Sequence, residues 1–176
     1  MRHATVVRVA ICIMASIATG VVALAQSPHY VKGPDATLNG SDAVVSWKEA
    51  GLGGVIPAQV TYTANASGTA TYACINRGGN HPSASNKQAV NGPVSSSGTF
   101  PIAKNGTVTG SLSISPPAST LDCPGGQAEV LACVSYSGIS LTSSAQGTAV
   151  AANPSSLGPA CLLSGNLVDL CSTLCP

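Results

Sequence analysis

The stretch Thr107–Ser115 reads TVTGSLSIS and shows the clearest strand pattern in the chain. Every second residue from Val108 to Ile114 is apolar or glycine, and the residues between them are threonine or serine. Because successive side chains of a β-strand point to opposite faces, this alternation predicts a strand with one buried face and one solvated face. Pro116 and Pro117 are expected to end the strand, since proline cannot donate a hydrogen bond to a neighbouring strand.

Segments of similar character recur along the chain, and most are rich in Thr, Val and Tyr, which suit a pleated, half-buried surface. The main predicted strand segments are residues 36–38, 43–47, 58–64, 69–75, 97–103, 107–115 and 127–141. About seven or eight short strands, with a turn every 8–12 residues or so, are typical of an antiparallel β-sandwich. The sequence therefore predicts an all-β fold, an antiparallel β-sandwich of immunoglobulin-like architecture.

Three segments predict turns between these strands. Asn39-Gly40 predicts a type I′ hairpin, because both residues accept positive φ, and Asn105-Gly106 predicts a second turn of this kind. The segment Asn65–Gly68 predicts a turn between the strands on either side of it. Asn39, Asn65 and Asn105 also begin N-x-Ser/Thr sequons, which carry glycans only in a competent secretory pathway.

The immunoglobulin signature itself is not met. Tyr72 and Cys74 have the Tyr-x-Cys spacing of a tyrosine corner. A true immunoglobulin domain pairs that cysteine with an earlier one, and a tryptophan lies between the two. Here Trp47 precedes Cys74, but no cysteine lies between residue 26 and Cys74. The expectation is thus an immunoglobulin-like architecture without its core disulfide.

The first 25 residues have the pattern of a secretory signal peptide. Basic residues at positions 2–8 precede an apolar run, Val9–Val22, and Ala23-Leu24-Ala25 matches the signal-peptidase rule, which predicts cleavage after Ala25. The apolar run is short and rich in small residues for a membrane anchor. We expect a secreted, extracellular protein that begins at Gln26 and has no membrane span in the mature chain.

Charge is scarce in this sequence. Only 7% of the residues are charged and 3% are aromatic, against about 25% charged in an average soluble domain. Residues 26–176 carry five basic and six acidic side chains, a net charge of −1. A nucleic-acid-binding protein needs a basic face to replace counterions, so no nucleic-acid partner is expected.

Six cysteines remain after the predicted cleavage: Cys74, Cys123, Cys133, Cys161, Cys171 and Cys175. An even number in a secreted chain predicts up to three disulfides, with about 15 connectivities open. A zinc site would need a second Cys or His pair beside Cys171-x₃-Cys175, and none follows the spacing. No metal and no cofactor are therefore expected.

Residues 153–176 are expected to form a short Cys-rich tail after the sandwich domain, residues 26–152. Leu167, Leu170 and Leu174 fall at helical spacing, enough for a turn or two of helix. Cys133 lies in an apolar strand and is a plausible anchor for the tail cysteines. We therefore expect a tail pinned to the sandwich by disulfides.

Two long runs, residues 71–117 and 122–142, resemble a set of small secreted microbial proteins of uncharacterised function. The shared pattern is Cys-x-Asn-x-Gly-Gly from Cys74, then Asn86-Lys87, then Cys123-Pro124 before a final apolar strand. The resemblance covers roughly residues 28–145 and excludes Cys133 and the tail. It implies a signal peptide, a β-sandwich and a bridge between Cys74 and Cys123, and it implies no activity.

The longest polar stretch within the predicted domain, Asn76–Lys87, is the candidate site. Binding groups of a rigid sandwich commonly lie on its loops, and Gly78-Gly79 would let backbone amides approach a ligand. The side chains that could hydrogen-bond a sugar or an anion are Arg77, Asn80, His81, Asn86 and Lys87. The alternative is a plain solvated connection between strands.

Catalytic motifs are absent from the sequence: it has no G-x-S-x-G, H-E-x-x-H or P-loop pattern. His81, Ser83 and Asp122 can be drawn as a hydrolytic set, but any serine-rich chain permits such a drawing. We therefore expect a secreted, non-catalytic β-sandwich with a structural or binding role toward an unknown extracellular ligand or surface partner. A fimbrial, polymer-forming subunit is the alternative, and a secreted hydrolase is a weaker one.

Overall fold

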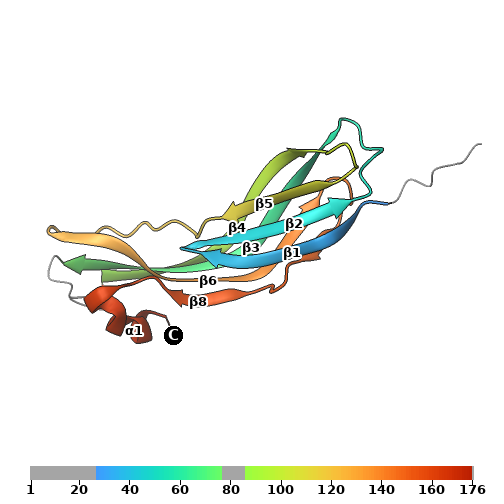
Figure 1. Cartoon of the computed structure of the whole chain (residues 1–176). Coiled ribbons are helices and arrows are strands. Elements are labelled where there is room, and N and C mark those ends of the chain that lie inside the picture. The colour runs from blue at the N-terminus through green and yellow to red at the C-terminus, as the bar shows by residue number, and fades with distance from the viewer. Residues whose placement is uncertain (1–26, 77–85, 176) are drawn as a thin grey trace, which may run out of the picture.

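The computed structural model of the protein describes residues 27–76 and 86–175 (Figure 1). In this part of the chain the strands form two antiparallel sheets, and two short helical segments lie near the carboxyl end. The elements are β1 (His29–Asn39), β2 (Asp42–Ala50), β3 (Gln59–Asn76), β4 (Lys87–Pro101), β5 (Val108–Ile114), β6 (Gln127–Ser143), β7 (Ala149–Ala151), β8 (Leu157–Cys161), the 3₁₀ helix η2 (Gly165–Leu170) and α1 (Cys171–Leu174).

The two sheets pack face to face as a sandwich, as predicted. The smaller sheet has the order β1-β2-β5, and the larger has the order β4-β3-β6-β7. Strand β8 also pairs with β6, farther along the same edge than β7. The tail predicted for residues 153–176 therefore supplies a strand to the larger sheet before its helical segments begin.

The alternation predicted for β5 is confirmed. Val108, Leu112 and Ile114 are buried, whereas the serine and threonine side chains between them are exposed. The buried side of β5 helps to enclose three aromatic rings, because Gly110 leaves room that a side chain would fill. A Cβ atom on Gly110 would lie 2.8 Å from Phe100 and 2.9 Å from Trp47.

The centre of the sandwich is an aromatic cluster contributed by both sheets. The ring centroid of Trp47 on β2 lies 4.6 Å from that of Tyr62 on β3 and 5.2 Å from that of Phe100 on β4. The Phe100 ring meets both neighbours edge-on, an arrangement that favours aromatic pairs beyond their burial. The cluster therefore ties β2 of the smaller sheet to β3 and β4 of the larger one.

Next to this cluster lies a buried carboxylate. Glu49 on β2 is fully buried, and it accepts hydrogen bonds from Tyr62 Oη at 2.6 Å, Ser143 Oγ at 2.8 Å and Gln146 Nε2 at 2.7 Å. Burial, followed by the hydrogen bond to Glu49, holds the pKa of Tyr62 far above its usual value. This one side chain therefore links β2 to β3, to β6 and to the turn after β6.

The turn predicted at Asn65–Gly68 is wrong. Residues 59–76 form one continuous strand of 18 residues, β3, which pairs with β4 on one side and β6 on the other. Gly68 is a packing position instead, because a Cβ there would lie 2.9 Å from Pro117 Cδ and 3.2 Å from Val94 Cγ2. The missing side chain lets the segment after β5 cross over the sheet at this point.

We expect Gly68→Ala to destabilise the fold by about 1–3 kcal/mol, because the added methyl overpacks this crossing. Gly92 lies directly opposite Gly68 on β4, and a Cβ there would meet nothing within 4 Å. Gly92→Ala is therefore the matched control and should be neutral or stabilising by about 0.5–1 kcal/mol. Equal effects of the two substitutions in denaturant titrations would contradict the packing role of Gly68.

The first hairpin forms as predicted, but its turn differs by one residue. Asn39 pairs with Asp42, so Gly40 and Ser41 are the two loop residues. Gly40 has φ of 60°, and none of the described non-glycine residues has positive φ. Positive φ at the first loop position alone matches a type II′ turn rather than type I′. Asn39 therefore ends β1 instead of entering the turn.

The second Asn-Gly turn connects the two sheets rather than two paired strands. Gly106, with φ of 71°, donates its N–H to the carbonyl of Ala103 at 2.8 Å, which closes the turn between β4 and β5. Strand β4 belongs to the larger sheet and β5 to the smaller. A tight turn can therefore carry the chain across the open side of the sandwich.

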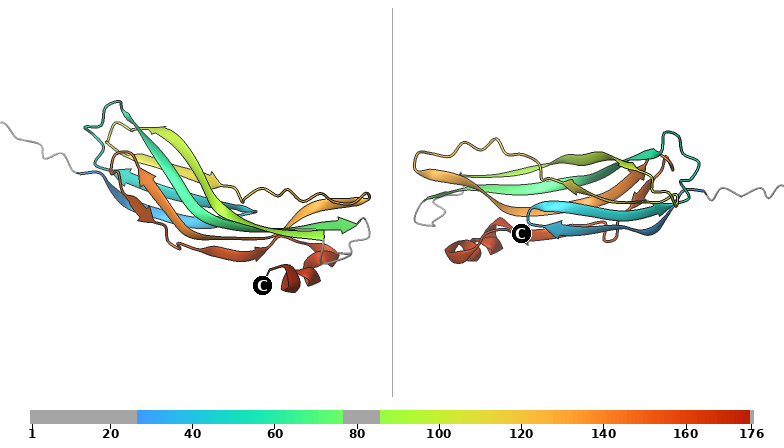
Figure 2. Two further views of the ribbon diagram at one scale, coloured as in Figure 1. Left: turned by 180° about the vertical axis from the view of Figure 1, so that it is seen from behind. Right: turned by 45° about the horizontal axis from the view of Figure 1, so that its top comes forward.

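The larger sheet extends well beyond the smaller one. Past the row formed by Gly92, Gly68 and Tyr136, the strands β4, β3 and β6 continue without a facing sheet (Figure 1). We call this part the distal arm, residues 69–76, 87–91 and 127–135. We call residues 115–126 the crossover segment. Figure 2 shows this segment along one face of the distal arm and the helical end of the tail along the opposite face.

The tail helices η2 and α1 cover their face of the distal arm with a second, small apolar cluster. Leu174 is buried against Ala73, Ile75 and Ala132, and its helical neighbours are partly buried beside them. The helical spacing predicted for Leu167, Leu170 and Leu174 is thus confirmed. The cluster is separate from the main core, so the described part of the chain has two apolar centres.

Tyr136 on β6 lies at the boundary between the two-sheet sandwich and the distal arm. Its hydroxyl points at the carbonyl oxygens of Ser41 at 2.7 Å and Ile114 at 3.2 Å. Burial, together with the charge of Asp42, raises the pKa of Tyr136 to about 12. The protonated hydroxyl therefore ties the larger sheet to the end of the smaller one.

A raised pKa in the folded state makes stability pH-dependent. The contribution of Tyr136 is complete below the unfolded pKa, about 10, and is lost as the pH rises through the folded pKa of about 12. A two-unit shift corresponds to about 2–3 kcal/mol. We expect Tyr136→Phe to lose less stability than the unsubstituted protein between about pH 9 and about pH 12, measured by urea unfolding. Identical losses would contradict the assignment.

Candidate functional site

The described ends of the predicted polar loop, Asn76 on one side and Asn86-Lys87 on the other, lie in or next to the distal arm. Of its candidate residues, Arg77, Asn80 and His81 lie outside the residues that the structure describes, whereas Asn86 and Lys87 lie within them. Asn76 ends β3, and Lys87 begins β4 opposite Ala73, so the described flanks of the loop lie on neighbouring strands but three residues apart along β3. The site can therefore be built from these flanks and from their neighbours on β6.

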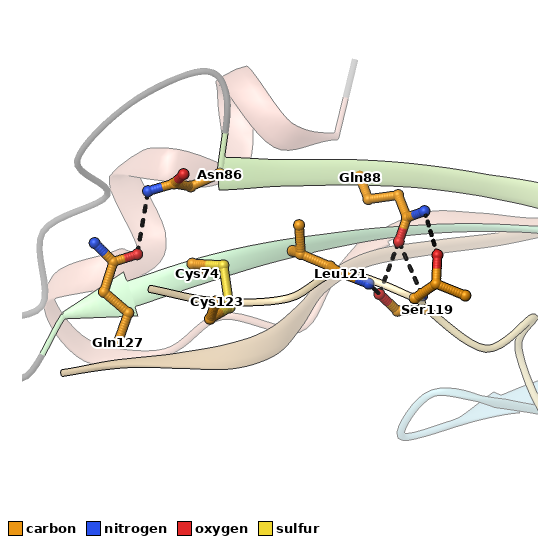
Figure 3. The surroundings of a disulfide bond; sticks show 8 residues. Cys74, Asn86, Gln88, Ser119, Leu121, Cys123 and Gln127 are labelled. Carbon is orange, nitrogen blue, oxygen red and sulfur yellow. Dashed lines mark hydrogen bonds between the residues drawn. A yellow bond between two sulfur atoms is a disulfide. The ribbon is translucent and has the colours of Figure 1, made fainter. Parts of the chain in front are cut away.

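Asn86 is bound to the first residue of β6. Its Nδ2 donates to Gln127 Oε1 at 3.2 Å (Figure 3). Gln127 is also the register partner of Asn76 at the end of β3. Asn76 and Asn86 thus both adjoin Gln127 where β3 and β6 reach the tip of the sheet.

Lys87 lies elsewhere, although it follows Asn86 directly. Its exposed side chain lines a hollow of about 240 Å³ between the sheet and α1, together with Thr71, Ala89, Thr173 and Leu174. The structure therefore does not bring Asn86 and Lys87 to one place. Asn86 belongs to the tip of the arm, and Lys87 belongs to the face that the tail helices cover.

A larger hollow, of about 420 Å³, lies at the tip itself. Its lining combines two amide side chains with apolar and backbone groups. The lining residues are Ile75, Asn76, Gly126, Gln127, Ala128 and Val130. Sequence reasoning missed the four residues from β6 and the turn before it, because they read as the start of an ordinary strand. The turn residues Pro124-Gly125-Gly126 were the available signal.

The disulfide Cys74–Cys123 joins β3 to the crossover segment two residues before β3 ends at Asn76 (Figure 3). Cys74 on β3 is fully buried, and its Cα lies 5.6 Å from that of Cys123 in the crossover segment. This is the bridge that the resemblance implied. It fixes the crossover segment to the end of β3, on the face opposite the tail helices.

A polar network fastens the same segment to β4. Gln88 Oε1 accepts from Ser119 Oγ at 2.9 Å and from the Thr120 N–H at 3.0 Å, and Gln88 Nε2 donates to Thr120 Oγ1 at 3.0 Å (Figure 3). These bonds use both ends of the Gln88 amide. Together with the disulfide, these hydrogen bonds hold the crossover segment against β3 and β4 next to the tip.

Tyr72 fastens the start of the crossover segment, and it is not a tyrosine corner. Its hydroxyl donates to the Pro117 carbonyl at 2.9 Å, 45 residues away in the sequence. A tyrosine corner bonds to the backbone only a few residues upstream. Burial, and secondarily the charge of Glu129, raises the pKa of Tyr72.

The described residues that line the hollow at the tip can hold a ligand through hydrogen bonds and apolar contacts. Amide side chains donate and accept hydrogen bonds and do not titrate, and the rest of the lining is aliphatic or backbone. Among residues 27–76 and 86–175 no group of three or more His, Cys, Asp and Glu side chains could hold a metal ion. The lining suits an uncharged ligand that carries hydroxyl or amide groups.

The hydrolytic set drawn from the sequence is described only in part. His81 and Ser83 fall outside the described residues, and Asp122 is exposed on the crossover segment. His29 lies at the opposite end of the molecule, where its Nδ1 contacts the Ser27 carbonyl at 2.8 Å. The described residues thus bring no second member of the set to Asp122.

In the described part of the chain no helix combines the length and the apolar character that crossing a membrane requires. Comparisons with protein-family models, with curated proteins and with solved structures found no match to this chain.

Proposed function

We propose that the protein is a secreted, non-catalytic β-sandwich of immunoglobulin-like type, which binds an uncharged polar ligand outside the cell through the tip of its distal arm. The observation that carries the proposal is the construction of that tip. A sheet that projects past its partner sheet is cross-linked on both faces, and its end is a hollow lined by Asn76 and Gln127.

Disulfides on both faces of the arm support an extracellular location. They persist in oxidising compartments and replace the apolar core that a facing sheet would supply. The signal-peptide pattern of residues 1–25 and the resemblance to small secreted microbial proteins support the same location. The alternative of an exported hydrolase has no titratable group among the described residues that line the hollow to support it.

Strand order supports the immunoglobulin-like type. One sheet pairs the first, second and fifth strands, and the other pairs the fourth, third, sixth and seventh. The chain changes sheet after β2, β4 and β5, which is the Greek-key connection of such sandwiches. A fimbrial subunit remains the alternative type, and no specific contact in the described residues favours it.

The proposal is tested by binding to a panel of neutral immobilised glycans and insoluble surface polymers, measured by co-sedimentation. Gln127→Ala is expected to weaken binding about tenfold, because one or two hydrogen bonds to the ligand are lost. Gln59→Ala is the matched control, since Gln59 is an exposed glutamine at the other end of β3, and it should bind normally.

Two results would overturn the proposal. One is binding that Gln127→Ala leaves unchanged while the variant unfolds at the normal temperature. The other is turnover of generic ester, glycoside or peptide substrates by the purified protein. Gln127→Glu provides a second variant, because it keeps the acceptor for Asn86 and removes the amide N–H that would donate to the ligand, so it should weaken binding without losing the Asn86 contact.

A further inference from the structure

The four cysteines of the tail region form two neighbouring disulfides. Cys133 on β6 and Cys161 on β8 stand directly opposite each other in the sheet. Cys171 and Cys175 lie one helical turn apart, with the Cys175 N–H bonded to the Cys171 carbonyl at 2.9 Å. The bridges run crosswise from strand to helix, Cys133–Cys175 and Cys161–Cys171. Each cysteine therefore has a cysteine of the other bridge as its neighbour.

The tail helices depend on these bridges. Helix η2 has six residues and α1 has four, and neither has a side-chain cap at its first turn. Isolated helices of this length are not stable in water. Apart from the disulfides, Leu174 is their one fully buried contact with the distal arm.

We propose that the two tail disulfides are an exchangeable pair, with a second pairing, Cys133–Cys161 and Cys171–Cys175, that frees the tail helices from the distal arm. Directly opposed residues of antiparallel strands have Cα atoms about 4.5–5.5 Å apart. That separation lies within the range of about 4.4–6.8 Å found for disulfides. Cys171 and Cys175 can pair within the tail once the short helix unwinds.

The exchange needs only a catalytic monothiol. Its thiolate attacks Cys175 Sγ, which is more accessible than the buried Cys133, and the Cys133–Cys175 bond breaks to give a mixed disulfide on Cys175 and a Cys133 thiolate. The Cys133 thiolate attacks Cys161 Sγ, forms Cys133–Cys161 and releases a Cys171 thiolate.

The Cys171 thiolate then attacks Cys175 Sγ in the mixed disulfide, forms Cys171–Cys175 and returns the monothiolate. Two disulfides are present before and after, so no oxidant or reductant is consumed. In the second state no disulfide joins the tail helices to β6 or β8, and only the backbone through residues 162–164 connects them to β8. The apolar side chains of Ala73, Ile75 and Ala132 are then uncovered.

The third disulfide serves as an internal control. Cys74 is fully buried and faces the crossover segment, whereas its neighbours Ala73 and Ile75 face the tail helices. Cys74–Cys123 is therefore shielded from the tail cysteines by the sheet and should keep its partner during exchange.

The direct test uses the full chain with a catalytic amount of 2-mercaptoethanol. Exchange is stopped by acid, and the disulfides are mapped on peptides by mass spectrometry. We expect Cys133–Cys161 and Cys171–Cys175 to accumulate at constant thiol content, with Cys74–Cys123 unchanged and proteolysis of the tail about tenfold faster or more. Native pairings alone, or random pairings that include Cys74, would overturn the proposal.

A pair of double variants gives an independent test. Cys171→Ser with Cys175→Ser leaves Cys133 and Cys161, which are expected to form a disulfide with no free thiol. Cys161→Ser with Cys171→Ser retains the native Cys133–Cys175 bridge and is the matched control. Two free thiols in the first variant, with Cys74–Cys123 intact and the second variant fully oxidised, would show that the cross-strand pair cannot form.

Discussion

Replacing Glu49 by alanine is expected to lower the free energy of unfolding by about 3–5 kcal/mol. The carboxylate is fully buried and accepts three hydrogen bonds, from Tyr62, Ser143 and Gln146. Its removal would leave these three donors without an acceptor at one end of the sandwich and would open a cavity among them. An unsatisfied buried donor costs about 1–3 kcal/mol, so the three together account for the size of the effect.

Glu129→Ala is the matched control, since this carboxylate is exposed on the distal arm. Its effect should stay within about 0.5 kcal/mol. The loss of stability for Glu49→Gln should lie between those of the two alanine variants. The amide keeps the shape of the carboxylate, but its NH₂ group donates and would face one of the three donors that Glu49 accepts from. Urea titrations of the three variants decide the matter. A cost below about 1 kcal/mol for Glu49→Ala would show that water reaches the three donors.

Removal of the Cys74–Cys123 bridge, by Cys74→Ser with Cys123→Ser, is expected to cost about 4 kcal/mol. The bridge joins residues 49 positions apart, and the loop-entropy model assigns a larger stabilisation to a longer loop. It also fastens the crossover segment over the distal arm, which has no facing sheet there. The measurement is guanidinium unfolding of the variant under oxidising conditions.

Cys161→Ser with Cys171→Ser is the comparison, because that bridge spans only 10 positions. On the same model it contributes about 3 kcal/mol. The decisive comparison is which of the two double variants loses more stability, and the larger loss is expected for the Cys74–Cys123 variant. A smaller loss for the Cys74–Cys123 variant than for the Cys161–Cys171 variant would mean that the crossover segment stays in place without its disulfide.

Period-two alternation was sufficient to predict the strands that have one buried face. It holds in β5 and also in β2, where the residues at positions 43, 45, 47 and 49 are all buried. The same period-two alternation places Glu49 on the buried face of β2, although a charged side chain is usually exposed. A carboxylate in phase with buried Val45 and Trp47 was therefore a signal in the sequence for the hydrogen-bonded centre.

Local turn signals failed where long-range packing decided the conformation. The local sequence predicts a turn at Gly68, but this residue lies inside β3 because Pro117 and Tyr136 pack against it. Asn39 sits one position outside its turn because the register with Asp42 sets the loop. In both cases the strand partner, which lies far along the chain or across the hairpin, determines the outcome.

The candidate site was located only in part for the same reason. The polar composition of residues 76–87 indicated the end of the molecule where the hollow lies. Gln127, which bonds Asn86 and lines the hollow, is 41 residues from it in sequence. Only the register between β3 and β6 brings Asn76 and Gln127 together, and no local pattern encodes that register.

If the protein is secreted as proposed, the arm without a facing sheet should carry its disulfides on both faces outside the cell. The most direct measurement is a non-reducing peptide map, with an intact mass, of the protein collected from the culture medium with its thiols blocked at harvest. We expect a chain that begins at Gln26, has no free thiol, and is linked Cys74–Cys123, Cys133–Cys175 and Cys161–Cys171. Retention of the protein in the cell, or free cysteines at these positions, would contradict this expectation.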